Sequence, residues 1–417
     1  MTPMPEQPLN PHQRAVVFAV ATFDTKAEEL AFVTACLRQA LVDVVTVDVS
    51  AARETDAADV SGSEVLAASG LTLSDVQSKD RGGAVTMMSD AFRIWLLQQR
   101  TKGRVAGVIG IGGSGGTAIV TAGMRALPVG IPKLMVSTMA SGNTAPYVDC
   151  SDICLMPSIV DVAGLNTVSQ RVLSNAAHAM AGMVTHFVTE TVARPAIGMT
   201  MFGVTTTCVT AVRKSLEDVG FDCLVFHATG TGGRAMEKLV ESGLIEGVLD
   251  VTTTEVADEV VGGILSAGPQ RFDVILQKQI PYVMSLGALD MVNFGAKETV
   301  PDRFRNRTLH VHNANVTLMR TTADENHQVA EWIAAKLNLS SSAVTLLIPE
   351  QGVSAVDTAG QPFHDPTADA VLFDEIESLV EQSELRRIVR HPLHINDAEF
   401  ARALVDEFLR LWALRRT

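Results

Sequence analysis

Short apolar runs rich in β-branched residues alternate along this chain with stretches of helical periodicity, and this alternation limits the possible folds more than any other feature. The run AVVFAVAT at 15–22 predicts a buried strand, residues 25–41 predict an amphipathic helix, and residues 42–50 predict the next strand. Elements of both kinds continue to alternate up to residue 138. Strand–helix–strand order of this kind indicates a parallel sheet with helices on its faces.

Segments in the second half of the chain resemble segments in the first half. Residues 195–206 resemble the strand that begins at 15, residues 247–255 resemble GVIGIGGSG, and residues 280–290 resemble IPKLMVSTMASG. The sequence therefore predicts an α/β protein made of two doubly wound, Rossmann-like domains with mainly parallel sheets.

Long helical periodicity with few turn signals at 165–194 predicts a connecting helix. We expect it to join an N-terminal domain at 1–180, which holds a glycine-rich loop, to a C-terminal domain at 195–417. The helix carries more apolar surface than a linker needs, and small residues such as Ala177 and Gly182 permit close helix approach. We therefore expect a homodimer, or a higher homo-oligomer, that buries this surface.

The composition argues against several classes of partner. The formal net charge is −14 and the Lys and Arg residues are dispersed, unlike the basic patches of nucleic-acid-binding proteins. No apolar run approaches the roughly 20 residues that cross a bilayer, and the first residues lack the apolar centre of a signal peptide. The five cysteines lack the paired spacing of a zinc site, so we expect reduced thiols and no bound zinc. These observations favour a cytoplasmic protein with small-molecule ligands and neither nucleic acid nor a membrane as partner.

The stretch GVIGIGGSGGT at 107–117 has six glycines in its first ten residues, although glycine loses more backbone entropy on folding than any other residue. It lies between a predicted strand and a predicted helix, where backbone N–H groups and the helix dipole can bind an anion. The spacing of Gly110, Gly112 and Gly115 matches the dinucleotide fingerprint, but no acidic residue follows about 20 residues later and no Lys follows the glycines. Two explanations remain open, namely phosphate binding and close helix packing. If the loop binds phosphate, its cofactor-binding residues are Gly112, Gly113, Ser114, Gly115, Gly116 and Thr117.

The motif TFDTK, residues 22–26, links the first predicted strand to the first predicted helix. Thr25 and Glu28 have the spacing of a capping box, which uses both side chains for local hydrogen bonds. Lys26 can also contact a phosphate, and Asp24 can hold Mg²⁺ or accept a hydrogen bond from a ribose hydroxyl. We therefore assign Asp24, Thr25 and Lys26 to the cofactor site, with solvated surface charges as the alternative for Asp24 and Lys26.

Three loops of the second half also carry polar groups after predicted strands. VFHATGTGGRAME at 225–237 combines hydroxyl groups and glycines, which suits an anion, and TTTE at 252–255 and LGALDMVNFG at 286–295 follow the next two strands. We expect these loops to bind a small-molecule substrate through Thr229, Gly230, Thr231, Gly232, Gly233, Arg234, Thr253, Glu255 and Asn293.

Two residues of these loops are candidates for catalysis. His227 is a candidate general base because imidazole exchanges protons near neutral pH, and Asp290 is a second candidate catalytic group. A single His after a strand is also often a satisfied polar residue, so a structural role stays open. His310 and His312 point to one face if HVHN is a strand, but a metal site would need a third ligand that the sequence does not show.

Long motifs spread over the chain resemble those of one family, among them IGGSGGT, VDVAGLN, MFGVTTTCV, VFHATGTGGRAME and HNANVTLMRTT. From about residue 16 to residue 414 the chain resembles the family that contains the amino-terminal domain of the tomato mosaic virus resistance protein and its uncharacterised bacterial and fungal relatives. The resemblance implies two Rossmann-like domains, ATP with Mg²⁺ as bound by the plant member, and dimer formation, but no known reaction. Within the motif RALPVGIPKLMVSTMASGN we add Ser141 and Gly142 to the cofactor site. The family pattern G-T-x-D-T-K has Ala21 at its first position here, which narrows the allowed backbone if that position uses φ > 0.

Together these features predict a cytoplasmic protein that binds ATP and Mg²⁺, with the glycine loop and TFDTK around the phosphates. A small metabolite would be held by the second-half loops in an interdomain cleft, and an ATP-dependent enzyme is the first hypothesis. One alternative is a nucleotide-independent isomerase or lyase that uses His227 and Asp290. The other is a non-enzymatic sensor or interaction module in which the nucleotide only stabilises one conformation.

Overall fold

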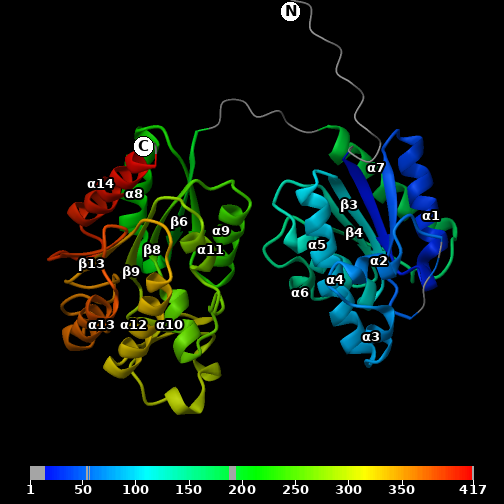
Figure 1. The fold of residues 1–417 in the computed structure, drawn as a ribbon. Coiled ribbons are helices and arrows are strands. Elements are labelled where there is room, and N and C mark those ends of the chain that lie inside the picture. Colours follow the sequence, from blue (N-terminus) through cyan, green and yellow to red (C-terminus); the bar gives the residue numbers. More distant parts are fainter. Residues whose placement is uncertain (1–14, 53–54, 56, 187–193, 416–417) are drawn as a thin grey trace, which may run out of the picture. The chain divides into compact units, whose positions relative to one another are not determined.

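The computed structural model describes residues 15–52, 55, 57–186 and 194–415, and the chain divides into two compact units at residues 1–190 and 191–417 (Figure 1). Each unit has its own parallel sheet and its own hydrophobic core. The prediction of an α/β fold with two Rossmann-like domains is confirmed. No helix in the described part of the chain combines the length and the apolar character that a membrane crossing needs.

The N-terminal sheet has five parallel strands within the described residues. In spatial order they are β2 (Val44–Asp48), β1 (Val16–Ala21), β3 (Val105–Gly112), β4 (Lys133–Ser137) and β5 (Cys154–Pro157). Their sequences are largely apolar because helices cover both faces of the sheet. The chain places β2 on one side of β1 and the later strands on the other. Such a switch point opens a crevice at the carboxyl ends of the two central strands, where doubly wound sheets bind ligands.

Helices cover both faces of this sheet. One face is covered by α1 (Phe23–Gln39) and α7 (Thr167–Thr185). The opposite face is covered by α2 (Gly62–Ala67), α3 (Leu73–Gln77), α4 (Arg81–Thr101) and α5 (Ser114–Ala126). A short helix, α6 (Ala145–Val148), packs beside α5. The long α4 and α5 pack on each other. The first turns of these two helices lie at the carboxyl edge of the sheet, beside the residues that follow β1 and β2.

The predicted connecting helix corresponds to α7, which ends at Thr185, and residues 187–193 of that prediction lie outside the described residues. Its apolar residues, including Leu173, Ala177 and Met180, are buried against the N-terminal sheet and α1. The helix therefore packs as part of the N-terminal core, and its predicted role in connecting the two domains stays a prediction. Val168 and Met183 of the same helix are exposed, at 42% and 36%. The covered part of the apolar surface gives the homodimer no support, and the homodimer stays a prediction.

The C-terminal sheet repeats the N-terminal strand order and adds one strand. In spatial order its six described strands are β14 (Arg386–His391), β13 (Val344–Pro349), β9 (Tyr282–Gly287), β8 (Gly247–Thr252), β6 (Ala196–Met201) and β7 (Asp222–His227). All neighbouring pairs are parallel. The strands β6, β8 and β9 occupy the positions of β1, β3 and β4, and these are the segments whose sequences resemble each other. The predicted internal repeat is therefore confirmed.

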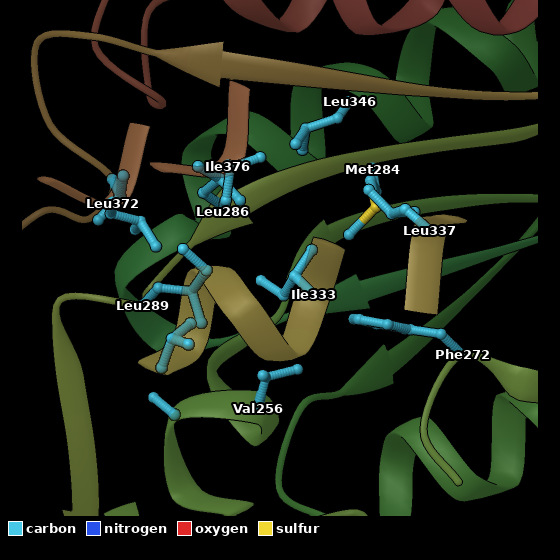
Figure 2. Close-up of a cluster of buried hydrophobic side chains, with 14 of the residues drawn as sticks. Val256, Phe272, Met284, Leu286, Leu289, Ile333, Leu337, Leu346, Leu372 and Ile376 are labelled. Atoms are coloured by element: carbon cyan, nitrogen blue, oxygen red, sulfur yellow. The ribbon is translucent and has the colours of Figure 1, made fainter. Parts of the chain in front are cut away.

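Two helices, α8 (Thr206–Asp218) and α14 (Ala398–Leu414), cover one face of this sheet. The other face is covered by α9 (Thr231–Glu241), α10 (Thr254–Val261), α11 (Asp273–Gln277), α12 (Ala323–Asn338) and α13 (Pro366–Leu379). Figure 2 shows the core on this second face, where Leu286 of β9, Ile333 of α12 and Ile376 of α13 belong to one cluster of buried side chains. Burying each such side chain contributes roughly 1.5–3 kcal/mol to the stability of the folded state. This core therefore fixes the ends of the strands from which the C-terminal loops begin.

A small antiparallel sheet, which the sequence did not predict as a unit, follows β9. It consists of β10 (Met291–Phe294), β12 (Val316–Arg320) and β11 (Leu309–Asn313), in that spatial order. The predicted strand HVHN lies in β11. Within the described residues no group of three His, Cys, Asp or Glu side chains is arranged to hold a metal ion.

Candidate phosphate-binding site

The carboxyl ends of β1 and β3 border a cavity of about 360 Å³ in the N-terminal unit. Its wall contains Asp24, Thr25 and Lys26 from the first turn of α1, and residues 113–116 from the loop and first turn after β3. Val49, which follows β2, contributes apolar surface. The two motifs that the sequence assigned to the cofactor therefore lie together at the switch point of the sheet.

The glycines at the end of β3 and in the loop after it fall into two groups. A Cβ atom on Gly110 would lie 2.6 Å from Val120 Cγ1, and one on Gly112 would lie 2.9 Å from the backbone of the first turn of α5. Close packing of β3 on α5 therefore requires these two glycines. Packing does not require the other three, whose Cβ atoms would meet no atom closer than 3.5 Å: Gly113, Gly115 and Gly116.

The first turn of α5 presents backbone N–H groups that nothing else uses. Gly113 is the N-cap residue and has no side chain to cap the helix. The first intrahelical hydrogen bond runs from the Thr117 amide to the Gly113 carbonyl, at 2.8 Å. The amides of Ser114, Gly115 and Gly116 have no acceptor in the part of the chain that the structure describes. Such amides at the positive end of a helix dipole are suited to a phosphate.

Two predicted cofactor residues of this loop support it instead of facing the cavity. Gly112 is buried in β3, and the buried Thr117 hydroxyl lies 2.6 Å from Ser137 Oγ. This hydrogen bond joins α5 to β4 and so fixes the first turn of α5 against the sheet.

The start of α1 is satisfied internally, unlike the start of α5. The amide of Phe23 donates to Asp48 Oδ1 at 3.1 Å, and the amide of Asp24 donates to Ser50 Oγ at 3.2 Å. The helix begins at Phe23, and Thr25 Oγ1 lies 3.0 Å from Thr22 Oγ1, so a start at Thr25 with a Thr25–Glu28 capping box does not describe this turn. The Asp24 carboxylate lines the cavity, with its side chain partly exposed.

The family position at which glycine was expected needs none. Ala21 is the last residue of β1, and it is not among the described residues with positive φ. Alanine is therefore compatible with the backbone at this point of the cavity wall.

Two cations line the cavity. The Lys26 ammonium donates to the carbonyl oxygen of Val162, and Glu29 Oε1 accepts from the Gly164 amide at 2.7 Å, so α1 is tied to the loop after β5. An ammonium has three donors, so Lys26 keeps donors for a ligand.

Arg81, which the sequence reasoning missed, is the second cation in the cavity wall. It is the first residue of α4, is exposed, and makes no ion pair with any described residue. The sequence contains a signal for the start of this helix, because Asp80 before Arg-Gly-Gly-Ala is a typical N-cap residue. Its position beside the glycine loop depends on the packing of α4 on α5 and was not readable.

The predicted residues Ser141 and Gly142 lie outside this cavity. Ser141 lines a separate cavity at the ends of β4 and β5, and Gly142 is exposed in the turn that follows β4. The structure therefore does not group them with the residues around α5.

The glycine loop of the C-terminal unit is closed by a carboxylate of the protein. Glu255 Oε1 accepts hydrogen bonds from the amides of Gly230, at 2.7 Å, and Gly233, at 3.0 Å. Gly230 has φ +83°, and a Cβ atom on Gly232 or Gly233 would overlap the His227 carbonyl or the Glu255 carboxylate. Internal packing thus accounts for all three glycines, and Glu255 occupies the position that we expected an anionic substrate to take.

Arg271 holds Glu255 in a buried ionic network. Its guanidinium donates to Glu255 at 2.8 Å, to Asp250 at 2.8 Å and to Glu237 at 3.0 Å, and the Tyr282 hydroxyl donates to Asp250 at 3.0 Å. Burial alone would lower the pKa of Arg271, but the three carboxylates hold it well above its ordinary value. The guanidinium therefore stays charged and fixes this closed loop.

The candidate catalytic residues His227 and Asp290 are not brought together. His227 is exposed at the end of the edge strand β7, whereas Asp290 follows β9 and is 1% exposed. Between β7 and β9 lie β6 and β8, which separates the strand ends by about 14 Å at 4.8 Å per strand. The observed geometry does not support one catalytic site made of both residues.

Asp290 belongs to a buried cluster of charges. Its Oδ2 accepts from the Ser354 hydroxyl at 2.7 Å, and Arg320 donates to Asp369 at 2.6 Å. Burial, followed by the neighbouring carboxylate of Asp357, raises the pKa of Asp290 to about 7. Burial also raises the pKa of Asp369 to about 8. These acids are core groups in this structure.

The other predicted substrate residues are divided between core and surface. Asn293 is buried and donates to Asp258 Oδ2 at 2.6 Å, and the buried Thr253 hydroxyl donates to the Ser285 carbonyl at 3.1 Å. Thr231 and Arg234 are exposed at the start of α9, and the Thr229 amide donates to the His227 carbonyl at 2.8 Å.

The fold and site define a protein with two doubly wound α/β domains, in which the N-terminal switch point carries a cavity with unused amides and two cations. The chain belongs to an uncharacterised protein family, UPF0261, whose N-terminal domain model matches residues 15–189 and whose C-terminal domain model matches residues 194–412.

Relatives match over nearly the whole chain. A UPF0261 protein of Rhizobium meliloti is 54% identical over 393 residues, covering 94% of this chain and 98% of that protein. A UPF0261 protein of Clostridium tetani is 44% identical over 398 residues, covering 95% and 98%. The ToMV resistance protein Tm-1(GCR237) of Solanum lycopersicum is 48% identical over 424 residues, and the match covers 95% of this chain but 55% of the tomato protein. The expected family resemblance is confirmed.

Proposed function

We propose that the N-terminal cavity binds the phosphates of a nucleotide, with ATP and Mg²⁺ as the ligand. The observation that carries the proposal is the free first turn of α5. Its amides lack acceptors among the described residues, and its glycines are not needed for packing. Arg81 and Lys26 add positive charge at the same cavity. Backbone donors and cations together form the usual environment of a bound polyphosphate.

The remaining wall of the cavity suits the other parts of this ligand. Val49 and Val85 offer apolar surface to a base, and Asp24 offers a carboxylate to Mg²⁺. Mg²⁺ is typically held by one or two carboxylates together with phosphate oxygens and water, so one protein ligand is sufficient. ATP is the nucleotide that the sequence resemblance implies.

The experiment that tests this proposal is calorimetric titration of ATP with Mg²⁺ into the parent protein and the Arg81→Ala variant. Loss of a hydrogen-bonded charge costs about 1.5–3 kcal/mol, so Kd should rise about 10- to 150-fold. Arg100→Ala is the matched control, because Arg100 is exposed near the other end of α4. A parent protein that does not bind ATP, or equal affinities for the parent and Arg81→Ala, would refute the proposal.

Within this proposal, an ATP-dependent enzyme of the cytoplasm that acts on a small metabolite remains the first hypothesis. The isomerase or lyase alternative has less support, because it relied on His227 and Asp290 acting together. A nucleotide sensor is distinguished by product analysis. A sensor leaves ATP intact in the presence of each metabolite tested, whereas an enzyme consumes ATP with one of them.

A further inference from the structure

A second cavity, of about 230 Å³, lies at the carboxyl ends of β4 and β5 in the N-terminal unit. Its wall is formed by the last residue of β4 with residues 138 and 141, and by the last residue of β5 with residues 158–161. It neighbours the loop of the phosphate site. The Thr138 amide donates to the Gly112 carbonyl at 3.3 Å, and a Cβ atom on Gly113 would lie 3.8 Å from Thr138 Oγ1. The loop after β3 therefore separates two neighbouring cavities on one edge of the sheet.

The polar groups that this second cavity offers are hydrogen-bond acceptors and hydroxyls. Thr138, Ser141 and Asp161 are exposed, and their side chains have no partner within the described ranges. Ser158 is already used, since its hydroxyl donates to the Val160 carbonyl at 2.7 Å. The lining contains no Lys, Arg or His. A carboxylate without a cation repels anions and accepts hydrogen bonds from hydroxyl or ammonium groups.

The rim of the cavity holds a strained apolar residue. Ile159 has φ +68° and is 75% exposed, and the Val160 amide donates to the Ser158 carbonyl across it, at 2.8 Å. A β-branched residue in this conformation costs about 1–3 kcal/mol, and such strain is concentrated at ligand-binding sites. The bond from Ser158 N to the Ser137 carbonyl, at 3.2 Å, holds the turn beside the cavity. The isoleucine side chain is thus available to cover the carbon skeleton of a ligand.

The loop after β5 also connects the two cavities. Directly beyond Asp161, Val162 accepts the hydrogen bond of Lys26, whose side chain lines the phosphate cavity. The Gly164 amide is held by Glu29 of α1. One loop therefore forms a wall of the second cavity and anchors a cation of the first.

We infer that this second cavity binds a small, uncharged or cationic molecule rich in hydroxyl or ammonium groups, through Asp161, Thr138 and Ser141. The role of this molecule as the partner of the nucleotide rests on the proposed function, because, of these two cavities, the first has Lys26 and Arg81 to bind phosphates, whereas the second has no cation among its described lining residues. The apolar rim at Ile159 limits the ligand to one with an exposed carbon face.

The test is a ligand-observed NMR screen of the full chain with three size-matched classes of probe, namely polyols such as ribitol, diamines such as putrescine, and dicarboxylates such as succinate. Each is used at about 10 mM, which reveals Kd values of a few mM. We expect binding by a polyol or a diamine, and at least a tenfold loss of affinity in Asp161→Asn. Asp90→Asn, at an exposed acid on α4, is the control and should bind as the parent does.

Several results would overturn the inference. These are binding of dicarboxylates in this cavity, no binding by any polyol or diamine, or unchanged affinity in Asp161→Asn. ATP affinity is measured on the same samples to separate the two proposals. Loss of ATP binding with retained Asp161-dependent binding would refute the proposed function and leave this cavity assigned, and the reverse result would refute only the second cavity.

Discussion

Replacing Gly115 by alanine separates ligand binding from packing more sharply than any other change in the glycine loop. Its Cβ atom would lie 3.5 Å from Val85 Cγ2, an ordinary contact, and Gly115 lies in the first turn of α5. Alanine is favoured over glycine in helices by roughly 0.5–1 kcal/mol, so the variant should be as stable as the parent or slightly more stable. The new methyl group, however, stands on the cavity wall beside the free amides.

The expected loss of affinity follows from those amides. If the methyl group keeps a phosphate from one or two charge-assisted hydrogen bonds, each about 1.5–3 kcal/mol, the Kd for ATP with Mg²⁺ rises at least tenfold. Gly112→Ala is the contrasting variant, because its Cβ atom would lie 2.9 Å from the backbone of α5. Overpacking of this kind costs about 1–3 kcal/mol, or several degrees in Tm.

The assay combines thermal unfolding, followed by circular dichroism, with calorimetric titration of ATP and Mg²⁺. We expect Gly115→Ala to keep its Tm and lose affinity, and Gly112→Ala to lose Tm. The reasoning is refuted if Gly115→Ala binds ATP as tightly as the parent. It is equally refuted if its Tm falls as far as that of Gly112→Ala, since the glycine would then serve packing.

Three further predictions concern the C-terminal unit. Glu255→Ala leaves the amides of Gly230 and Gly233 unpaired, so the free energy of unfolding measured in urea should fall by about 2–6 kcal/mol. The control Glu241→Ala removes an exposed carboxylate and should lower the free energy of unfolding by less than about 1 kcal/mol. Equal losses in the two variants would contradict the interpretation that Glu255 closes this loop. The raised pKa values of Asp290, about 7, and Asp369, about 8, mean that the folded state retains protons that the unfolded state releases. The free energy of unfolding should therefore fall as pH rises from about 4 through 7–8, and Asp290→Asn should flatten this slope; an unchanged slope would show that Asp290 does not titrate in this way. His227→Ala should leave ATP affinity unchanged in calorimetry, because His227 belongs to the unit that the proposed phosphate site does not use; a tenfold weaker Kd would contradict that assignment.

The architecture was readable because buried parallel strands leave continuous apolar runs in the sequence. The run AVVFAVAT contains β1. Residues 247–255 resemble residues 107–115, and the strands in these two segments, β8 and β3, take equivalent positions in their sheets. The helix α7 (Thr167–Thr185) lies within the range 165–194 that was predicted as helix, but the surface that covers its apolar residues was not predicted. Its apolar stripe fits a sheet face as well as a partner subunit, and only the tertiary structure shows which surface covers it.

The site could be predicted only in part from the sequence, because two similar glycine loops differ in the group that accepts hydrogen bonds from their amides. Gly113 to Gly116 and Gly230 to Gly233 look alike in sequence, yet Glu255, which lies 25 residues after Gly230, fills the second loop. No local pattern reveals that contact. Arg81 was missed for the same reason, because the packing of α4 on α5 brings it to a loop more than 30 residues away.

The central claim is that the first turn of α5, and not the start of α9, receives the phosphates. The most direct measurement is the change in backbone amide NMR shifts when ATP with Mg²⁺ is titrated into the 417-residue chain. Ser114, Gly115 and Gly116 should shift in proportion to occupancy, while Gly230 and Gly233 should not, because Glu255 already accepts their hydrogen bonds. Shifts at Gly230 and Gly233 with none at 114–116 would contradict the account.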